Sequence, residues 1–203
     1  MQLWFNPNNE TGEAMTEPVM FSVNQLAEFP TSRAQGREGR ARLEDLIADN
    51  RGLDLTIDFA GVLAMTISFA DEFLGKFLAT LDATSHDMTV CVSGLNPENA
   101  ETIEVCLERR EVPVVVAEDG GHLGLLGDEL LQETYLAAAA RGSVRATELA
   151  EDLSLSPQNV NNRLKRLVAV GALRKTRNAG AARGGKEFLY STAAPDKSTA
   201  SVA

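Results

Sequence analysis

Residues 18–119 alternate between segments that favour strands and segments that favour helices. The strand-like segments are apolar or alternate in polarity, and they are 18–23, 53–59, 88–95 and 112–119. The helix-like segments show apolar residues at helical spacing, and they are 37–49, 68–81 and 96–110. The last strand-like segment is apolar without interruption, which indicates burial on both faces. This order predicts an α/β layer sandwich in which helices cover a sheet.

The rest of the chain has a different pattern. The glycine-rich run GGHLGLLG at 120–127 predicts a flexible linker. A run of helical segments follows, and it ends in two short strand-like pieces on either side of the loop NAGAARGG. We therefore expect two domains, 18–119 and 128–190. The remaining segments are an N-terminal extension at 1–17 and a small, polar tail at 191–203 that we expect to be disordered.

Charge divides the chain at nearly the same place. The whole chain has a formal charge of −10, but residues 141–190 contain ten Lys or Arg and only four Asp or Glu. Residues 1–140 contain eight basic and 24 acidic side chains. A change of sign this sharp indicates that the two parts have different partners, and only the basic part suits a polyanion.

Composition narrows the class of protein. No apolar run approaches the ~20 residues that span a bilayer, so we expect no membrane partner. The N-terminus lacks the basic start and apolar stretch of a secretory signal. Two cysteines are too few for a disulfide framework. These observations together predict a cytoplasmic protein.

The segment TELAEDLSLSPQNVNNRLKRLVAVGAL predicts two helices joined by a tight turn at 154–156. Ser156 is a favourable N-cap and Pro157 suits the first helical position of the second helix. An apolar stripe on that helix should face inward, and its members are Val160, Leu164, Leu167 and Val168. On or near the opposite face lie amide and guanidinium side chains, which can pair with base edges in the major groove: Gln158, Asn159, Asn162, Arg163 and Arg166.

This segment, together with the basic hairpin after it, resembles the winged helix-turn-helix of bacterial transcription regulators over residues 128–190. The resemblance implies that the helix at 157–169 enters the major groove of double-stranded DNA and that the hairpin touches the backbone. It also implies a homodimer. The side chains expected to contact phosphates are Lys165, Arg174, Lys175, Arg177, Arg183 and Lys186. The alternative is a winged helix that binds protein, with its basic side chains only solvated.

The run LTIDFAGVLAMTISFADEFLGKFL resembles STAS-like domains, relatives of the anti-sigma-factor antagonists, and the resemblance covers about 18–118. In the antagonists a serine at the start of this helix is phosphorylated by a partner kinase, and Ser68 is the matching position. The antagonists carry Asp-Ser-Ser-Gly there, whereas this chain has Thr-Ile-Ser-Phe. The alternative is that Ser68 is the N-cap of a capping box with Asp71, without any switching role.

Enzymatic and cofactor sites find little support. The run from Gly180 to Lys186 has the spacing of a phosphate-binding loop, but Glu187 stands where a Ser or Thr would bind magnesium, and no helix is expected after it. His86 and His122 lie in loop-like segments without a nucleophile beside them. Cys91 and Cys106 suit core positions. We expect no catalytic residues, no metal and no cofactor.

The leading hypothesis is a DNA-binding transcriptional regulator whose STAS-like domain senses or docks a partner. The alternative is a partner-switching signalling protein regulated by a serine kinase at Ser68. An enzyme ranks last.

Overall fold

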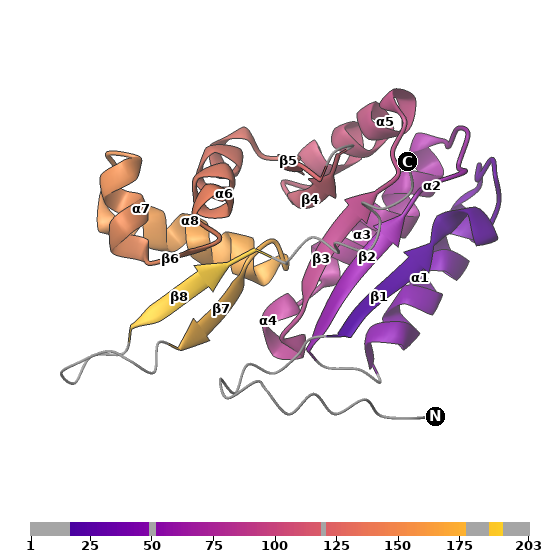
Figure 1. The fold of residues 1–203 in the computed structure, drawn as a ribbon. Coiled ribbons are helices and arrows are strands. Elements are labelled where there is room, and N and C mark those ends of the chain that lie inside the picture. The colour runs from indigo at the N-terminus through magenta and orange to yellow at the C-terminus, as the bar shows by residue number, and fades with distance from the viewer. Residues whose placement is uncertain (1–16, 49–51, 119–120, 178–186, 193–203) are drawn as a thin grey trace, which may run out of the picture.

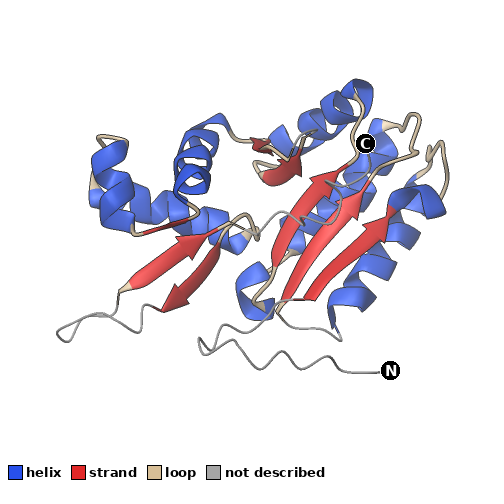
Figure 2. Ribbon diagram, in the orientation of Figure 1, coloured by secondary structure: helices blue, strands red, loops and turns tan. Residues whose placement is uncertain are grey.

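The computed structural model describes residues 17–48, 52–118, 121–177 and 187–192 of the 203-residue chain. These residues form a mixed α/β structure with two sheets, one of five strands and one of three (Figure 1). Helices pack around both sheets (Figure 2). No helix within these ranges is long and apolar enough to cross a membrane.

The five-stranded sheet carries its strands in chain order and is mainly parallel. Its strands are β1 (Glu17–Ser22), β2 (Leu53–Asp58), β3 (Thr89–Ser93), β4 (Val114–Ala117) and β5 (Leu123–Leu126). The first four run parallel and β5 runs antiparallel to β4. In β2 the buried residues Leu53, Leu55 and Ile57 alternate with half-buried ones, as expected for a pleated strand. The predicted strands are thus confirmed, including the burial of Val114–Val116 on both faces.

The predicted flexible linker is wrong over Leu123–Leu126, because these residues form β5 at the edge of the sheet. The glycine content of 120–127 obscured the alternation of Leu123 and Leu125. Gly121 and Gly127 adopt left-handed φ angles of 82° and 89° and lie on either side of the strand. A Cβ at Gly127 would lie 2.6 Å from the carbonyl oxygen of Val112, so only glycine fits this turn.

Helices cover one face of the five-stranded sheet. They are α1 (Arg33–Ala48), a continuous helical run from Ile67 to Thr80, and α5 (Pro97–Glu108). The run from Ile67 comprises α2 (Ile67–Ala70), a π-helical segment (Asp71–Gly75) and α3 (Lys76–Thr80). Two short helices are additional to the predicted ones, a 3₁₀ turn (Val23–Gln25) and α4 (Ala83–His86). Asn96 caps α5 and Pro97 begins it, as predicted.

Two glycines allow α1 to approach the π-helical segment closely. A Cβ at Gly36 would lie 2.9 Å from Cβ of Glu72, and a Cβ at Gly39 would lie 2.9 Å from the ring of Phe73. The core between these helices and the sheet is rich in phenylalanine, and Phe69 and Phe73 stack with ring centroids 5.3 Å apart. The shape of this core therefore depends on the lack of side chains along one face of α1.

Residues 129–191 form what we call the C-terminal assembly. Its helices are α6 (Glu129–Arg141), α7 (Ala146–Asp152) and α8 (Pro157–Ala169). Its antiparallel sheet has the order β6-β8-β7, with β6 (Ser143–Val144), β7 (Arg174–Arg177) and β8 (Phe188–Ser191). The two predicted helices, the Ser156 cap and the hairpin are confirmed. The hairpin tip at 178–186, with Arg183 and Lys186, lies outside the described residues, as do 1–16 of the predicted extension and 193–203 of the predicted tail.

The C-terminal assembly packs against the second face of the five-stranded sheet (Figure 1). One apolar cluster contains Val115 of β4 and Leu125 of β5 together with Leu131 and Tyr135 of α6. The same cluster continues to the apolar stripe of α8. The two parts of the molecule therefore share a core.

Candidate nucleic-acid interface and the Ser68 pocket

Helix α8 is strongly amphipathic. The backbone N–H of Asn159 donates to the Ser156 hydroxyl oxygen at 3.3 Å, which caps the first turn. Val160, Leu164 and Leu167 are fully buried against the rest of the C-terminal assembly. The packing of this stripe fixes which face of the helix meets solvent.

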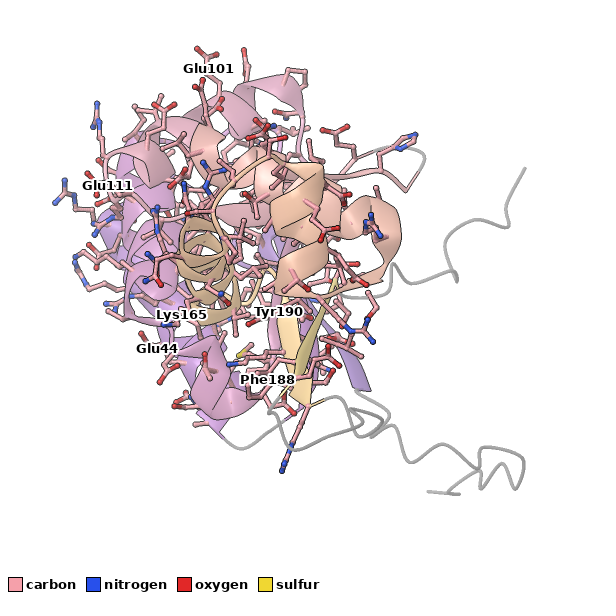
Figure 3. All side chains as sticks on the ribbon, turned by 90° about the vertical axis from the view of Figure 1, so that its left-hand side faces the viewer. Glu44, Glu101, Glu111, Lys165, Phe188 and Tyr190 are labelled. Carbon is pink, nitrogen blue, oxygen red and sulfur yellow. The ribbon has the colours of Figure 1, made fainter. Side chains whose placement is uncertain are left out.

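Four of the predicted DNA-contacting side chains on α8 are exposed without a side-chain partner among the described residues. They are Gln158, Asn159, Asn162 and Lys165. The neighbouring Asn161 differs, because its amide donates to the carbonyl oxygen of Pro157 at 2.8 Å. The side-chain amides of Gln158, Asn159 and Asn162 lie within the first six residues of α8. Lys165, which is labelled in Figure 3, follows them on the same helix.

Arg163 and Arg166 contact α6. The Nη1 group of Arg163 donates to the Leu130 carbonyl oxygen and to the Thr134 hydroxyl, both at 3.1 Å, and the side chain is only 15% exposed. Arg166 donates to Asp128 Oδ2 at 2.7 Å, and the other oxygen of the same carboxylate caps α6. The sequence pattern predicts that both guanidinium groups contact base edges of DNA. In the structure they hold α8 against the start of α6.

The basic side chains of the hairpin β7–β8 differ in their exposure to solvent. Lys175 and Arg177 are exposed, and Nζ of Lys175 lies 3.9 Å from the ring centroid of Phe188. Arg177 has no partner among the residues that the structure describes. Arg174 is different, because its half-buried side chain contacts the five-stranded sheet. Phe188 and Tyr190, both labelled in Figure 3, belong to β8.

Thr66, and not Ser68, is the N-cap of the helical run that carries the phosphorylation candidate. The Thr66 Oγ1 atom accepts from the Phe69 N–H at 3.2 Å and donates to the Thr31 carbonyl oxygen at 2.7 Å. Ser68 is the second residue of the helix. The predicted capping box with Asp71 is therefore wrong, because Asp71 accepts instead from Arg110 Nε at 2.6 Å.

Ser68 is half-buried in a shallow pocket of about 200 Å³. Its lining residues are Arg33, Ile67, Ser68, Asp71, Cys106 and Arg109. Arg33 and Arg109 are exposed and have no ion pair within the described ranges. The hydrogen bond from Arg110 lowers the pKa of Asp71, so this carboxylate is ionised and neutralised by its own partner. The guanidinium groups of Arg33 and Arg109 thus line the same pocket as the Ser68 side chain. They are 76 residues apart in sequence, so no local pattern could have paired them.

The two cysteines are at least partly buried, and the two histidines lie in or next to short elements. Burial raises the pKa of the Cys91 thiol to about 11, and burial also raises the pKa of Cys106. His86 ends α4, and His122 is exposed just before β5. Within the described ranges, no group of three or more His, Cys, Asp or Glu residues could hold a metal ion.

Comparison with known proteins assigns no family. No family model matches the chain, and no curated protein matches it. The winged-helix and STAS-like resemblances therefore stay predictions from the sequence.

Proposed function

We propose that this protein is a DNA-binding transcriptional regulator. In this proposal the C-terminal assembly is a winged helix-turn-helix with α8 as the recognition helix and β7–β8 as the wing, and residues 18–119 are a STAS-like domain that senses or docks a partner. The observation that carries the proposal is the exposed face of α8, where Gln158, Asn159 and Asn162 have no internal side-chain partner.

The dimensions and the direction of α8 suit a major groove. A helix of 13 residues is about 20 Å long, and the groove is about 12 Å wide. The C-terminal end of α8 is anchored to the five-stranded sheet, because the Gly171 carbonyl accepts from the Val90 N–H. The N-terminal end, where the amides lie, points away from that sheet (Figure 1).

The basic side chains divide by role in this proposal. Lys165, Lys175 and Arg177 are exposed and are assigned to phosphates. Arg163 and Arg166 are assigned to holding α8 in place through α6. Because recognition helices usually act in pairs on two half-sites, we propose that the protein binds as a homodimer.

Duplex binding measured by fluorescence anisotropy across a salt series tests this function. We expect affinity to fall steeply with salt, and Arg177→Ala to weaken all sequences alike and to reduce the slope of log K against log [salt] by about 0.9. We expect Asn162→Ala to change base preference, measured by selection from a random duplex library, without changing the slope.

The matched control is Arg37→Ala, which removes an exposed arginine from α1 in the other layer. It should leave affinity unchanged. If no duplex binds at low salt, or if Arg37→Ala weakens binding as much as Arg177→Ala does, the assignment of α8 and the hairpin to DNA is wrong.

A second candidate function is partner switching through phosphorylation of Ser68. The pocket favours it, because Arg33 and Arg109 can pair with a phosphate and Asp71 is already neutralised by Arg110. Protein carrying phosphoserine at position 68 should melt no lower than the unmodified protein. Arg33→Ala with Arg109→Ala should lower the melting temperature of the phosphorylated form more than that of the unmodified form. An equal effect on both forms would remove support for this function.

A further inference from the structure

Arg174 of the hairpin is bound to residues of the five-stranded sheet, far from it in the sequence. It is the first residue of β7, and its side chain is only 16% exposed. Its Nη2 group donates to the Leu53 carbonyl oxygen at 3.3 Å, to Asp54 Oδ1 at 3.2 Å and to the Asp87 carbonyl oxygen at 3.2 Å. These acceptors lie at the start of β2 and just before β3. The first strand of the hairpin is thus attached to the N-terminal ends of two sheet strands.

A backbone hydrogen bond supports the same attachment. The Val90 N–H of β3 donates to the Gly171 carbonyl oxygen at 2.9 Å, at a point of β3 where β4 has not yet begun to pair. Gly171 has a φ of 75°, and a Cβ there would lie 3.1 Å from the Val90 nitrogen. Ala172 and Leu173, which connect Gly171 to Arg174, are both buried. The segment between α8 and the hairpin is therefore built into the sheet.

Two interpretations of Arg174 make opposite predictions. The carboxylates of Asp54 and Asp87 lie 3.2 Å and 3.8 Å from the Arg174 guanidinium. They could occupy a DNA-contacting arginine in place of phosphates, and their removal would then free it. Alternatively, Arg174 could serve only to attach the hairpin. The acceptors decide between them. Two of the three hydrogen bonds go to backbone carbonyl oxygens, which hold Arg174 whether or not the two carboxylates are charged. The adjacent Ala172 and Leu173 are buried, which also favours attachment.

We propose that Arg174 is a positioning residue that attaches the hairpin β7–β8 to the five-stranded sheet and so sets the angle at which Lys175 and Arg177 meet a duplex. The inference rests on the proposed DNA-binding function for its affinity readout. It removes Arg174 from the predicted phosphate contacts and makes the N-terminal ends of β2 and β3 part of the DNA-binding apparatus.

The salt series separates positioning from phosphate contact. At a temperature where the variant is fully folded, we expect Arg174→Ala to weaken duplex binding about tenfold with the salt slope unchanged. Arg177→Ala, on the same strand, should lower the slope by about 0.9. A slope for Arg174→Ala that falls as it does for Arg177→Ala would overturn the proposal. An unchanged affinity would overturn it too, because it would leave Arg174 with a role in stability alone.

Substitution of Asp54 and Asp87 gives a second test, in which the direction of the change in duplex affinity separates the two interpretations. Asp87 has a φ of 50°, a conformation that asparagine tolerates well, so Asp87→Asn removes the charge without disturbing the backbone. We expect Asp87→Asn combined with Asp54→Asn to weaken duplex binding. Tighter binding would show that these carboxylates compete with DNA and would overturn the proposal. Asp82→Asn is a control for the loss of a nearby negative charge, because Asp82 is the N-cap of α4, a position that asparagine also suits. Asp82 has no hydrogen bond or ion pair with Arg174.

Amide hydrogen exchange tests the attachment without DNA. We expect Arg174→Ala to speed exchange at Val90 N–H at least tenfold and to leave amides in α5 unchanged. Unchanged exchange at Val90 would overturn the proposal. If the unaltered protein binds no duplex, the proposed function fails on its own account, and the exchange result still shows whether Arg174 holds the hairpin.

Discussion

Thr66 sets the start of the helical run that carries Ser68, because its hydroxyl both caps that helix and donates to the loop at Thr31. Thr66→Ala should therefore lower the free energy of unfolding by about 1 kcal/mol, the usual value of an N-cap. Ser68→Ala should cost less than about 0.5 kcal/mol, because Ser68 caps nothing. Urea denaturation of the two variants beside the unaltered protein measures both values. A larger loss for Ser68→Ala would mean that Ser68 supports the fold directly.

Residue roles could be predicted from the sequence only where the partner is near in the chain. The Ser156 cap and the apolar stripe of α8 depend on neighbours three to seven residues away, and both were predicted correctly. Arg163 bonds a residue 29 positions distant, and Arg174 bonds one 120 positions distant. Residue type and spacing assigned both to DNA, since an arginine on an amphipathic helix or a hairpin carries no local sign of an internal partner.

At the scale of elements, the π-helical segment brings a buried carboxylate between two cations. Glu72 is 3% exposed and accepts from Lys76 Nζ at 2.7 Å, while Arg40 of α1 lies 3.6 Å away. The hydrogen bond from Lys76 lowers the pKa of Glu72 below its ordinary value of 4.5. A lowered pKa contributes stability above pH 4.5, and this stability is lost as the pH falls through the value in the folded protein.

We therefore expect Glu72→Gln to destabilise the protein at pH 7, and the difference from the unaltered protein to shrink as the pH falls below about 4.5. Urea denaturation at several pH values measures it. Glu44→Gln is the control, because Glu44 pairs with the same Arg40 but its side chain is 46% exposed, so its removal should have little effect at any pH. A difference that stays constant with pH would show that packing, and not charge, accounts for Glu72.

Elements with strong local patterns were predicted from the sequence, and the strands of the five-stranded sheet differ in this respect. β2, β3 and β4 are apolar or alternating and were found. β5 was missed because glycines surround a strand of four residues, and the pairing with β4 that stabilises it is not visible in its own sequence.

For the whole molecule, the shared apolar cluster predicts a single unfolding transition. Tyr135 is fully buried in the same apolar cluster as Val115 and Leu125. Unfolding of the C-terminal assembly would therefore expose the face of the five-stranded sheet on which these two residues lie. Both tyrosines of the chain, Tyr135 and Tyr190, lie in that assembly, and their ring signals in NMR spectra report its unfolding. The methyl signals of Ile57 and Ile103 report the other layer.

The two sets of signals should vanish at the same urea concentration. Leu125→Ala should lower both midpoints together, by an amount equivalent to about 2–5 kcal/mol. Two separate midpoints would show that the parts are stable independently, as the sequence pattern of two domains had suggested.

The hydrogen bond from the Val90 N–H to the Gly171 carbonyl oxygen also limits where the chain can be cut to make shorter fragments. A truncation after residue 127 would remove the acceptor from β3 and uncover Val115 and Leu125, leaving an apolar sheet face of the kind that drives aggregation. The complementary fragment would lose the surface beneath Tyr135. The chain is thus not a pair of exchangeable modules, and a reporter or a foreign DNA-binding domain is best fused at a terminus, with residues 17–192 kept intact.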